Sequence, residues 1–195
     1  MKDNKIFVVN ERGYGMSDLK EANLEQTDLE KTDLEETNLK GANLKRANLI
    51  RAQLTWANLK GTHLEGTNLE KANLEGANLQ GAQLTRARLV GARLIGARLI
   101  EANLESAHLK EANLRWAYLR GAHLKEANLE SAYLQGANLQ GAHLQGTNLE
   151  GANLQGVHKL TIDQLSEVKT LYNAKLDEEL LISLKEKYPI LFEVK

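Results

Sequence analysis

The residues that could support chemistry are few and lie far apart in the sequence. The chain has no cysteine, which excludes disulfides, thiolate metal ligands and cysteine nucleophiles. Two of its five histidines, His123 and His143, are twenty residues apart, but no carboxylate completes a metal-binding motif around them. Ser106 and Ser131 have no partners for nucleophilic catalysis, and no glycine-rich phosphate loop occurs. We therefore expect no enzyme activity, no metal site and no cofactor.

Composition also limits the possible partners. The 195 residues, of which 42% are hydrophobic, are enough to build one core. Twenty-five basic and twenty-six acidic residues leave a formal net charge of -1, so we expect no general attraction to nucleic acid or membranes. The apolar run Ile6–Val9 is too short for a signal peptide. A cytoplasmic location is therefore expected.

A five-residue period dominates the chain. Leucine occupies every fifth position from Leu19 to Leu154, and a small residue, mostly alanine, stands two positions before each leucine. The residue between them is usually asparagine. A helix cannot use this period, because at about 100° per residue successive leucines would lie about 140° apart. In an extended segment, by contrast, the small residue and the leucine face the same side.

The two remaining residues of each unit are suited to a corner. All thirteen glycines between residues 17 and 156 stand on the second position after a leucine, where a type II turn requires a positive φ. The spacing predicts short extended segments alternating with corners. One such unit cannot bury its own leucine, so neighbouring units must stack into a continuous core.

The units from Ala22-Asn23-Leu24-Glu25-Gln26 to Ala152-Asn153-Leu154 resemble the pentapeptide-repeat family. The resemblance implies an all-β solenoid, a right-handed quadrilateral β-helix of about seven coils with four repeats in each. Residues twenty apart would then lie above one another. On this interpretation residues 17–156 form the β-helix.

The flanking segments are expected to cover the open strand edges of the solenoid. Residues 1–16 are interpreted as an N-terminal β cap and residues 157–195 as a C-terminal helical cap. Thr161 and Gln164 have the spacing of a capping box, ahead of Leu165, Val168 and Leu171. A second helix should begin near Asp177, turn Leu180, Leu181 and Leu184 inward, and end before Pro189.

One belt of residues departs from the polar pattern of the surface. Three consecutive repeats have an arginine before the leucine and Val or Ile after it, and these apolar side chains should point toward water. Two tryptophans would flank the belt from one corner column, three coils apart. The candidate protein-contact belt comprises Arg88, Val90, Arg93, Ile95, Arg98, Ile100, Trp56 and Trp116. His123 and His143 would stack on one face and are interpreted as ordinary surface residues.

The sequence favours a rigid scaffold that binds another protein, of unidentified nature. One alternative is suggested by the family resemblance, because some members imitate DNA and bind type II topoisomerases. Here the faces are nearly neutral, every repeat centre is leucine and no loop projects, which disfavours DNA mimicry. A second alternative is a consensus-like or engineered solenoid with no evolved partner.

Self-association is also possible. The C-terminal end has more apolar residues than the N-terminal end, so a dimer through Leu191 and Phe192 is favoured over a lateral one through Ile95 and Ile100. A monomer remains the other expectation.

Overall fold

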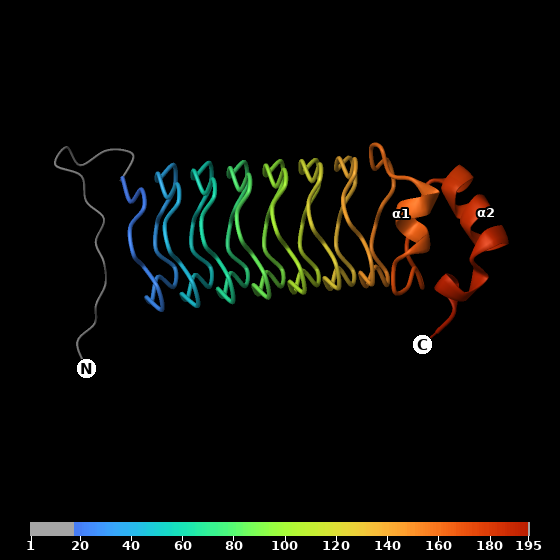
Figure 1. Cartoon of the computed structure of the whole chain (residues 1–195), viewed down its shortest axis with the longest axis horizontal. Helices are drawn as coiled ribbons and strands as arrows, with labels where there is room; N and C mark the ends of the chain where they lie inside the picture. Colours follow the sequence, from blue (N-terminus) through green and yellow to red (C-terminus); the bar gives the residue numbers. More distant parts are fainter. Residues whose placement is uncertain (1–17, 195) are drawn as a thin grey trace.

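The solenoid is seen directly in the computed structural model, which describes residues 18–194. Similar coils follow one another along the long axis, and two short helices lie at the C-terminal end of the stack (Figure 1). The expected N-terminal cap, residues 1–16, lies outside the described residues. Within residues 18–194, no helix has the length and apolar character needed to cross a membrane.

Four repeats make one coil. Each central residue forms a parallel β-bridge with the residue twenty positions later, for example Asn23 with Asn43 and Asn43 with His63. The bridges are isolated because each repeat has a corner after its short extended segment, so no long strand can form. Parallel hydrogen bonds join successive coils: the amide of Leu44 donates to the carbonyl of His63 at 2.8 Å, and that of Asn43 to Ala22 at 2.9 Å. The result is the pentapeptide-repeat β-helix that the resemblance implies.

The leucines of the period form the core. All of them from Leu24 to Leu154 are buried, and Leu19 in the first described coil is partly buried. From Thr37 to Ala152, the small residue two positions before each leucine is buried beside it, because a larger side chain would not fit on the same side as the leucine. Where the small residue is threonine, its hydroxyl can donate across coils, as from Thr67 to the carbonyl of Leu44 at 2.7 Å. The prediction that these leucines point inward is confirmed.

Every corner of the repeat region has a residue with positive φ at the second position after the leucine. The turn is closed by a backbone hydrogen bond, as from Ala42 to Leu39 at 3.0 Å. Thirteen of these corner residues are glycine, as expected, but fifteen others have side chains, including Glu111 with φ 59°. The stacked hydrogen bonds therefore hold this conformation even where glycine is absent.

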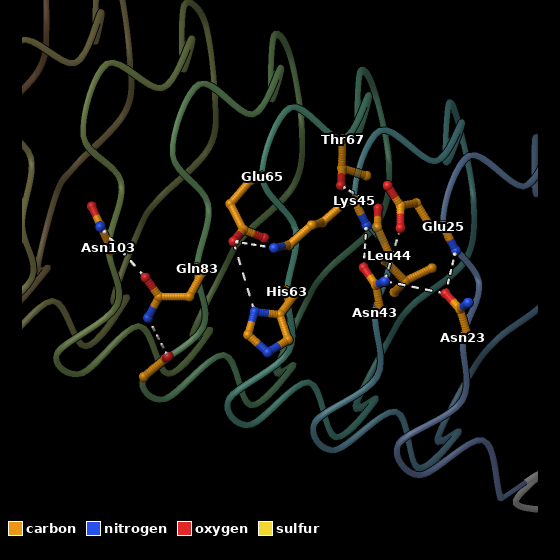
Figure 2. Close-up of polar contacts among 11 residues, drawn as sticks. Asn23, Glu25, Asn43, Leu44, Lys45, His63, Glu65, Thr67, Gln83 and Asn103 are labelled. Carbon is orange, nitrogen blue, oxygen red and sulfur yellow. Dashed lines mark hydrogen bonds and ion pairs between the residues drawn. The ribbon is translucent and has the colours of Figure 1, made fainter.

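The asparagines explain why the central position is polar. Each one is close to the following corner, and the side-chain oxygen of Asn43 accepts a hydrogen bond from the amide of Lys45 at 3.2 Å. Its amide group donates to Asn23 of the preceding coil at 3.1 Å (Figure 2). Asparagine thus stabilises both the corner and the stacking. For this reason most central asparagines point outward but are only half-exposed.

The β-ladder continues beyond the last regular repeat. Three more bridges follow: His158 with Asn138, Thr170 with Asn148, and Lys175 with Asn153. The last two pairs are separated by twenty-two residues instead of twenty. Helix α1 (Ile162–Ser166) lies in the sequence between His158, of the first of these bridges, and Thr170, of the second. It takes the place of one face of this additional, incomplete coil.

Helix α1 begins as the sequence predicts and ends earlier than expected. Thr161 and Gln164 form the capping box, with the Gln164 amide donating to the Thr161 hydroxyl at 3.2 Å. Leu165 is buried within the helix, whereas Val168 and Leu171 are buried after it has ended. These two residues belong to the additional coil, because extended backbone there pairs with the coil before it.

Helix α2 (Glu178–Lys187) covers the open end of the solenoid. Its N-cap is Asp177, and Leu184 is fully buried while Leu180 and Leu181 are half-buried against the core. A short 3₁₀-helix, η1 (Pro189–Phe192), follows directly. The predicted second helix, from Asp177 to a point before Pro189, is confirmed.

Candidate functional site

The stacked corners form four long edges, and one of them differs from the others in having exposed aromatic residues. Trp56 and Trp116 are corner residues of this edge, while Tyr133 and Tyr118 lie on the two faces that meet there. We call these four residues the aromatic edge. They are 63%, 61%, 43% and 51% exposed, respectively, which makes them the most exposed aromatic side chains within residues 18–194.

Each tryptophan lies over a glycine corner of the next coil. A Cβ atom added to Gly76 would be 2.4 Å from the Trp56 ring, and one added to Gly136 would be 2.5 Å from the Trp116 ring. One side of each indole therefore packs on bare backbone, and the other side faces solvent. The neighbouring corner, Gly96, has no atom within 4 Å of such a Cβ and stays open between them.

This packing can be tested with two matched glycine substitutions. We expect Gly81→Ala to lower the free energy of unfolding by about 1 kcal/mol because of its positive φ, and Gly76→Ala, which has nearly the same φ, to lower it by more because the added Cβ also displaces the Trp56 ring. Only Gly76→Ala should also shift the tryptophan emission spectrum, since only there must the Trp56 indole move. Fluorescence at native conditions and urea unfolding measure the two effects. Identical spectra for both variants would contradict the stacking of Trp56 on Gly76.

Three arginines accompany the aromatic edge. Arg93 donates to Glu75 of the preceding coil at 2.8 Å, so its charge is paired. The guanidinium of Arg115 lies 5.0 Å from the ring centre of Tyr133, in a cation–π contact. Among the residues that the structure describes, the side chain of Arg98 has no hydrogen bond and no ion pair. The edge therefore offers unpaired positive charge beside aromatic rings.

The structure divides the belt predicted from the sequence. It brings Arg93, Ile95 and Arg98 together with both tryptophans at the aromatic edge. Val90 and Ile100 lie at the two neighbouring edges, on opposite sides of it, and Arg88 belongs to a different face, where it pairs with Glu70. A flat partner cannot contact all of these residues at once.

The expected exposure of the apolar belt residues is a second point of correction. Val90, Ile95 and Ile100 are half-buried and do not point freely into water. The reason is the stacking of corners, because the side chains of Glu75 and Arg115 lie before and after Ile95 in the same column. The exposed apolar surface of this region comes from the aromatic residues instead.

The diagonally opposite edge has a different character. The carboxylate oxygen of Glu65 lies 3.2 Å from the ammonium nitrogen of Lys45 and 3.7 Å from Nδ1 of His63 (Figure 2). The positive charge of Lys45 is therefore paired with a negative charge at this edge. His123 and His143 stack with their ring centres 4.8 Å apart, as their spacing predicts. No group of three or more potential metal ligands was found within residues 18–194.

The C-terminal end does not offer the contact expected from the sequence. Leu191 is buried, and its carbonyl accepts a hydrogen bond from the amide of Leu171 at 2.6 Å. Phe192 is half-buried, with the Lys185 ammonium 5.7 Å from its ring centre. The prediction that Leu191 is free for end-to-end dimerisation is wrong, because η1 folds it back into the core. The exposed apolar residues of this end are Ile182, Ile190 and Val194.

Sequence reasoning missed Tyr118, Tyr133 and Arg115 as members of the site. The signal was present, because the alignment of residues in columns of twenty places Tyr118 one coil after Arg98, and Tyr133 two coils after Arg93 on the adjoining face. Only central residues of the two faces that share a corner can meet at one edge. The aromatic edge is therefore identified only when the columns of two adjoining faces are compared with each other, and not when each column is considered by itself.

Known proteins share this architecture. The chain matches the model of pentapeptide repeats in four overlapping stretches, residues 17–54, 52–89, 87–125 and 122–158. No curated protein is significantly similar to it in sequence.

Several solved structures are similar to this chain. A pentapeptide repeat protein from the Arabidopsis thaliana thylakoid lumen is 34% identical, with a TM-score of 0.53 over 54% of this chain and 73% of that one. HetL, a pentapeptide repeat protein involved in heterocyst differentiation regulation in the cyanobacterium Nostoc sp. strain PCC 7120, is 30% identical, with a TM-score of 0.46 over 82% of each chain. QnrB1, a plasmid-mediated fluoroquinolone resistance protein, is 21% identical, with a TM-score of 0.44. Because the family model matches its repeats from residue 17 to residue 158, the chain belongs to the pentapeptide-repeat family.

Proposed function

We propose that this protein is a non-enzymatic scaffold that binds another protein through the aromatic edge. The observation that carries the proposal is the gathering of Trp56, Trp116, Tyr118 and Tyr133 on one edge, all exposed. Tryptophan, tyrosine and arginine are the residues most enriched at the energetic centres of protein interfaces. Water contact of these rings is unfavourable, and a partner that covers them would relieve it.

The rigidity of the solenoid supports a scaffold role. Backbone hydrogen bonds join every described coil to the next, and the core leucines stack without interruption. The backbone of the aromatic edge is therefore held in a fixed position, which lowers the entropy lost on binding.

The chemistry of the edge favours binding over catalysis. The charged groups beside its aromatic rings are arginines and the carboxylate of Glu75, which is paired with Arg93. A guanidinium stays protonated at any physiological pH and cannot exchange a proton as a general acid or base. Aromatic rings and guanidinium groups recognise a surface; they do not activate a nucleophile.

DNA mimicry would require a different distribution of charge. DNA has one negative charge for about every 1.7 Å of its axis. Here the acidic residues concentrate in the first coil, where residues 17–36 contain eight acidic and two basic residues. Farther along the solenoid the aromatic edge is basic. We therefore do not propose, as the partner, a protein that recognises an extended surface with the negative charge of DNA.

The scaffold proposal is tested by capturing partners with the full-length protein from a lysate of its source cells. The variant Trp116→Ala, Tyr118→Ala removes the centre of the aromatic edge without touching the core, and His123→Ala on a different face is the control. We expect at least one partner that binds the wild type and the control but is about tenfold depleted with the double variant. Identical sets of captured proteins for all three would contradict the proposal.

A further inference from the structure

We propose that the partner segment bound at the aromatic edge is acidic and contains an apolar side chain, an inference that rests on the proposed function. The C-terminal part of this edge is poor in carboxylates: Glu75 is paired with Arg93, and Asp177 accepts a hydrogen bond from the backbone amide of Gly156 at the last corner at 3.0 Å. The central and corner residues that border it from Arg93 to His158 include three arginines and no aspartate or glutamate. A negatively charged segment would therefore meet little repulsion beside Arg98 and Arg115.

The arginines of the edge are available to such a segment. Arg98 has no polar partner among the described residues, and Arg115 is engaged only with the neutral groups of Tyr133 and Gln135. Of the three arginines, only Arg93 forms an ion pair with a carboxylate, that of Glu75. Guanidinium groups favour planar, two-point hydrogen bonds with carboxylates, so aspartate or glutamate side chains are the natural ligands.

The other edges lack this combination of arginines and aromatic rings. One neighbouring edge is also basic, with Lys40, Lys60 and Arg120, but it has no exposed aromatic residue at its corners, and the remaining two edges have mixed charge. At the diagonal edge, Glu105, Lys125 and Glu126 alternate in sign at successive corners. At one of the neighbouring edges, Lys110 donates to Glu130 at 2.8 Å, which raises the pKa of the lysine. Charges that are already paired attract a partner weakly. The combination of Arg98 and Arg115, which have no carboxylate partner, with four exposed aromatic side chains therefore distinguishes the aromatic edge from the other edges within residues 18–194.

The apolar part of the ligand follows from the shape of the edge. Gly96 is an open corner between the ring of Trp56 and the residue Trp116, and Ile95 lies next to it, half-buried. A leucine or aromatic side chain of the partner would cover Ile95 and the bare backbone of Gly96 while its acidic neighbours reach Arg93 and Arg98. Aromatic hot spots of this kind gain affinity when water is excluded around them.

The limited length of the basic stretch favours a peptide over a nucleic acid. Arg93 and Arg115 lie in successive coils, about 5 Å apart along the axis. Toward the N-terminus the same edge has Glu75, Glu36 and Glu35. An extended phosphate backbone that followed the edge would be repelled by these carboxylates, whereas a segment of a few extended residues would fit beside the arginines alone.

A random peptide library displayed on phage, with peptides of about twelve residues, tests the inference on the immobilised full-length protein. We expect enriched peptides to be rich in Asp and Glu and to contain an aromatic or aliphatic residue. Synthetic versions of them should bind about tenfold more weakly to Arg98→Glu, by fluorescence anisotropy, and more weakly at high salt. Arg86→Glu, an exposed arginine of the diagonal edge, is the matched control and should bind like the wild type.

Several results would overturn the inference. These are neutral or basic enriched peptides, no enrichment, or equal loss of binding with Arg98→Glu and Arg86→Glu. An oligothymidine of about twenty nucleotides that binds more tightly than the peptides, and depends on Arg98, would replace the peptide by a single-stranded nucleic acid. If lysate capture depends on Trp116 but the enriched peptides are not acidic, the scaffold function stands and the acidic ligand fails. If capture does not depend on Trp116, the scaffold function itself fails.

Discussion

Replacing Leu104 with alanine is expected to lower the free energy of unfolding by about 2 to 5 kcal/mol. Leu104 is 1% exposed and lies in the middle of the solenoid, between Leu84 and Leu124 of the neighbouring coils. Removing its side chain leaves a cavity that the hydrogen-bonded coils on both sides cannot close, because the backbone positions are fixed by the ladder. Urea unfolding followed by circular dichroism measures the loss.

The matched control is Leu19→Ala, which makes the same chemical change in the first described coil. Leu19 is only partly buried, so less contact is lost and the expected cost is well below that of Leu104→Ala. In a repeat protein each coil is stabilised mainly by its neighbours, which makes interior positions more sensitive than terminal ones. Equal costs at both positions would mean that the leucine columns are not the main source of stability.

Leu184→Asp is expected to detach helix α2 and expose the end of the solenoid. Leu184 is 0% exposed, so the variant places a carboxylate in an apolar site where no positive partner is available among the buried residues. The freed end presents unpaired backbone groups of the last coil to other molecules. We expect a lower unfolding midpoint and concentration-dependent association in analytical ultracentrifugation.

Ile182→Asp provides the comparison within the same helix. Ile182 is 53% exposed, and a charge there should leave folding unchanged. The pair also tests self-association. If a dimer forms through the exposed apolar residues of the C-terminal end, Ile182→Asp should produce monomers with wild-type stability. Association of Ile182→Asp as strong as that of Leu184→Asp would contradict the assignment of α2 as a cap.

Much of the fold could be predicted from the sequence because its information is local and repeated. The spacing of Leu24, Leu29 and their successors requires a side chain of the same kind to face inward in every repeat, and only extended segments with corners satisfy it. The corner position of the glycines follows from their freedom to adopt positive φ. Thr161 and Gln164 identified the start of α1, because a capping box depends on four consecutive residues alone.

The surface depended on contacts that no single repeat contains. The sequence singled out Trp56, Trp116 and Arg93, but it also grouped them with Val90 and Ile100, which stacking separates onto other edges. Tyr118 and Tyr133 join the site only because their two faces meet at the same corner.

The sequence by itself therefore determined the coil, the core and the capping signal, whereas the tertiary structure decided which surface residues meet. Leu191 illustrates the difference: its apolar character is visible in the sequence, but its burial depends on the path of η1 back to Leu171. A periodic pattern specifies direction, inward or outward, within each repeat. Which side chains contact each other, and how exposed each one is, is decided only when the coils and the C-terminal cap pack together, because these contacts join residues about twenty positions apart.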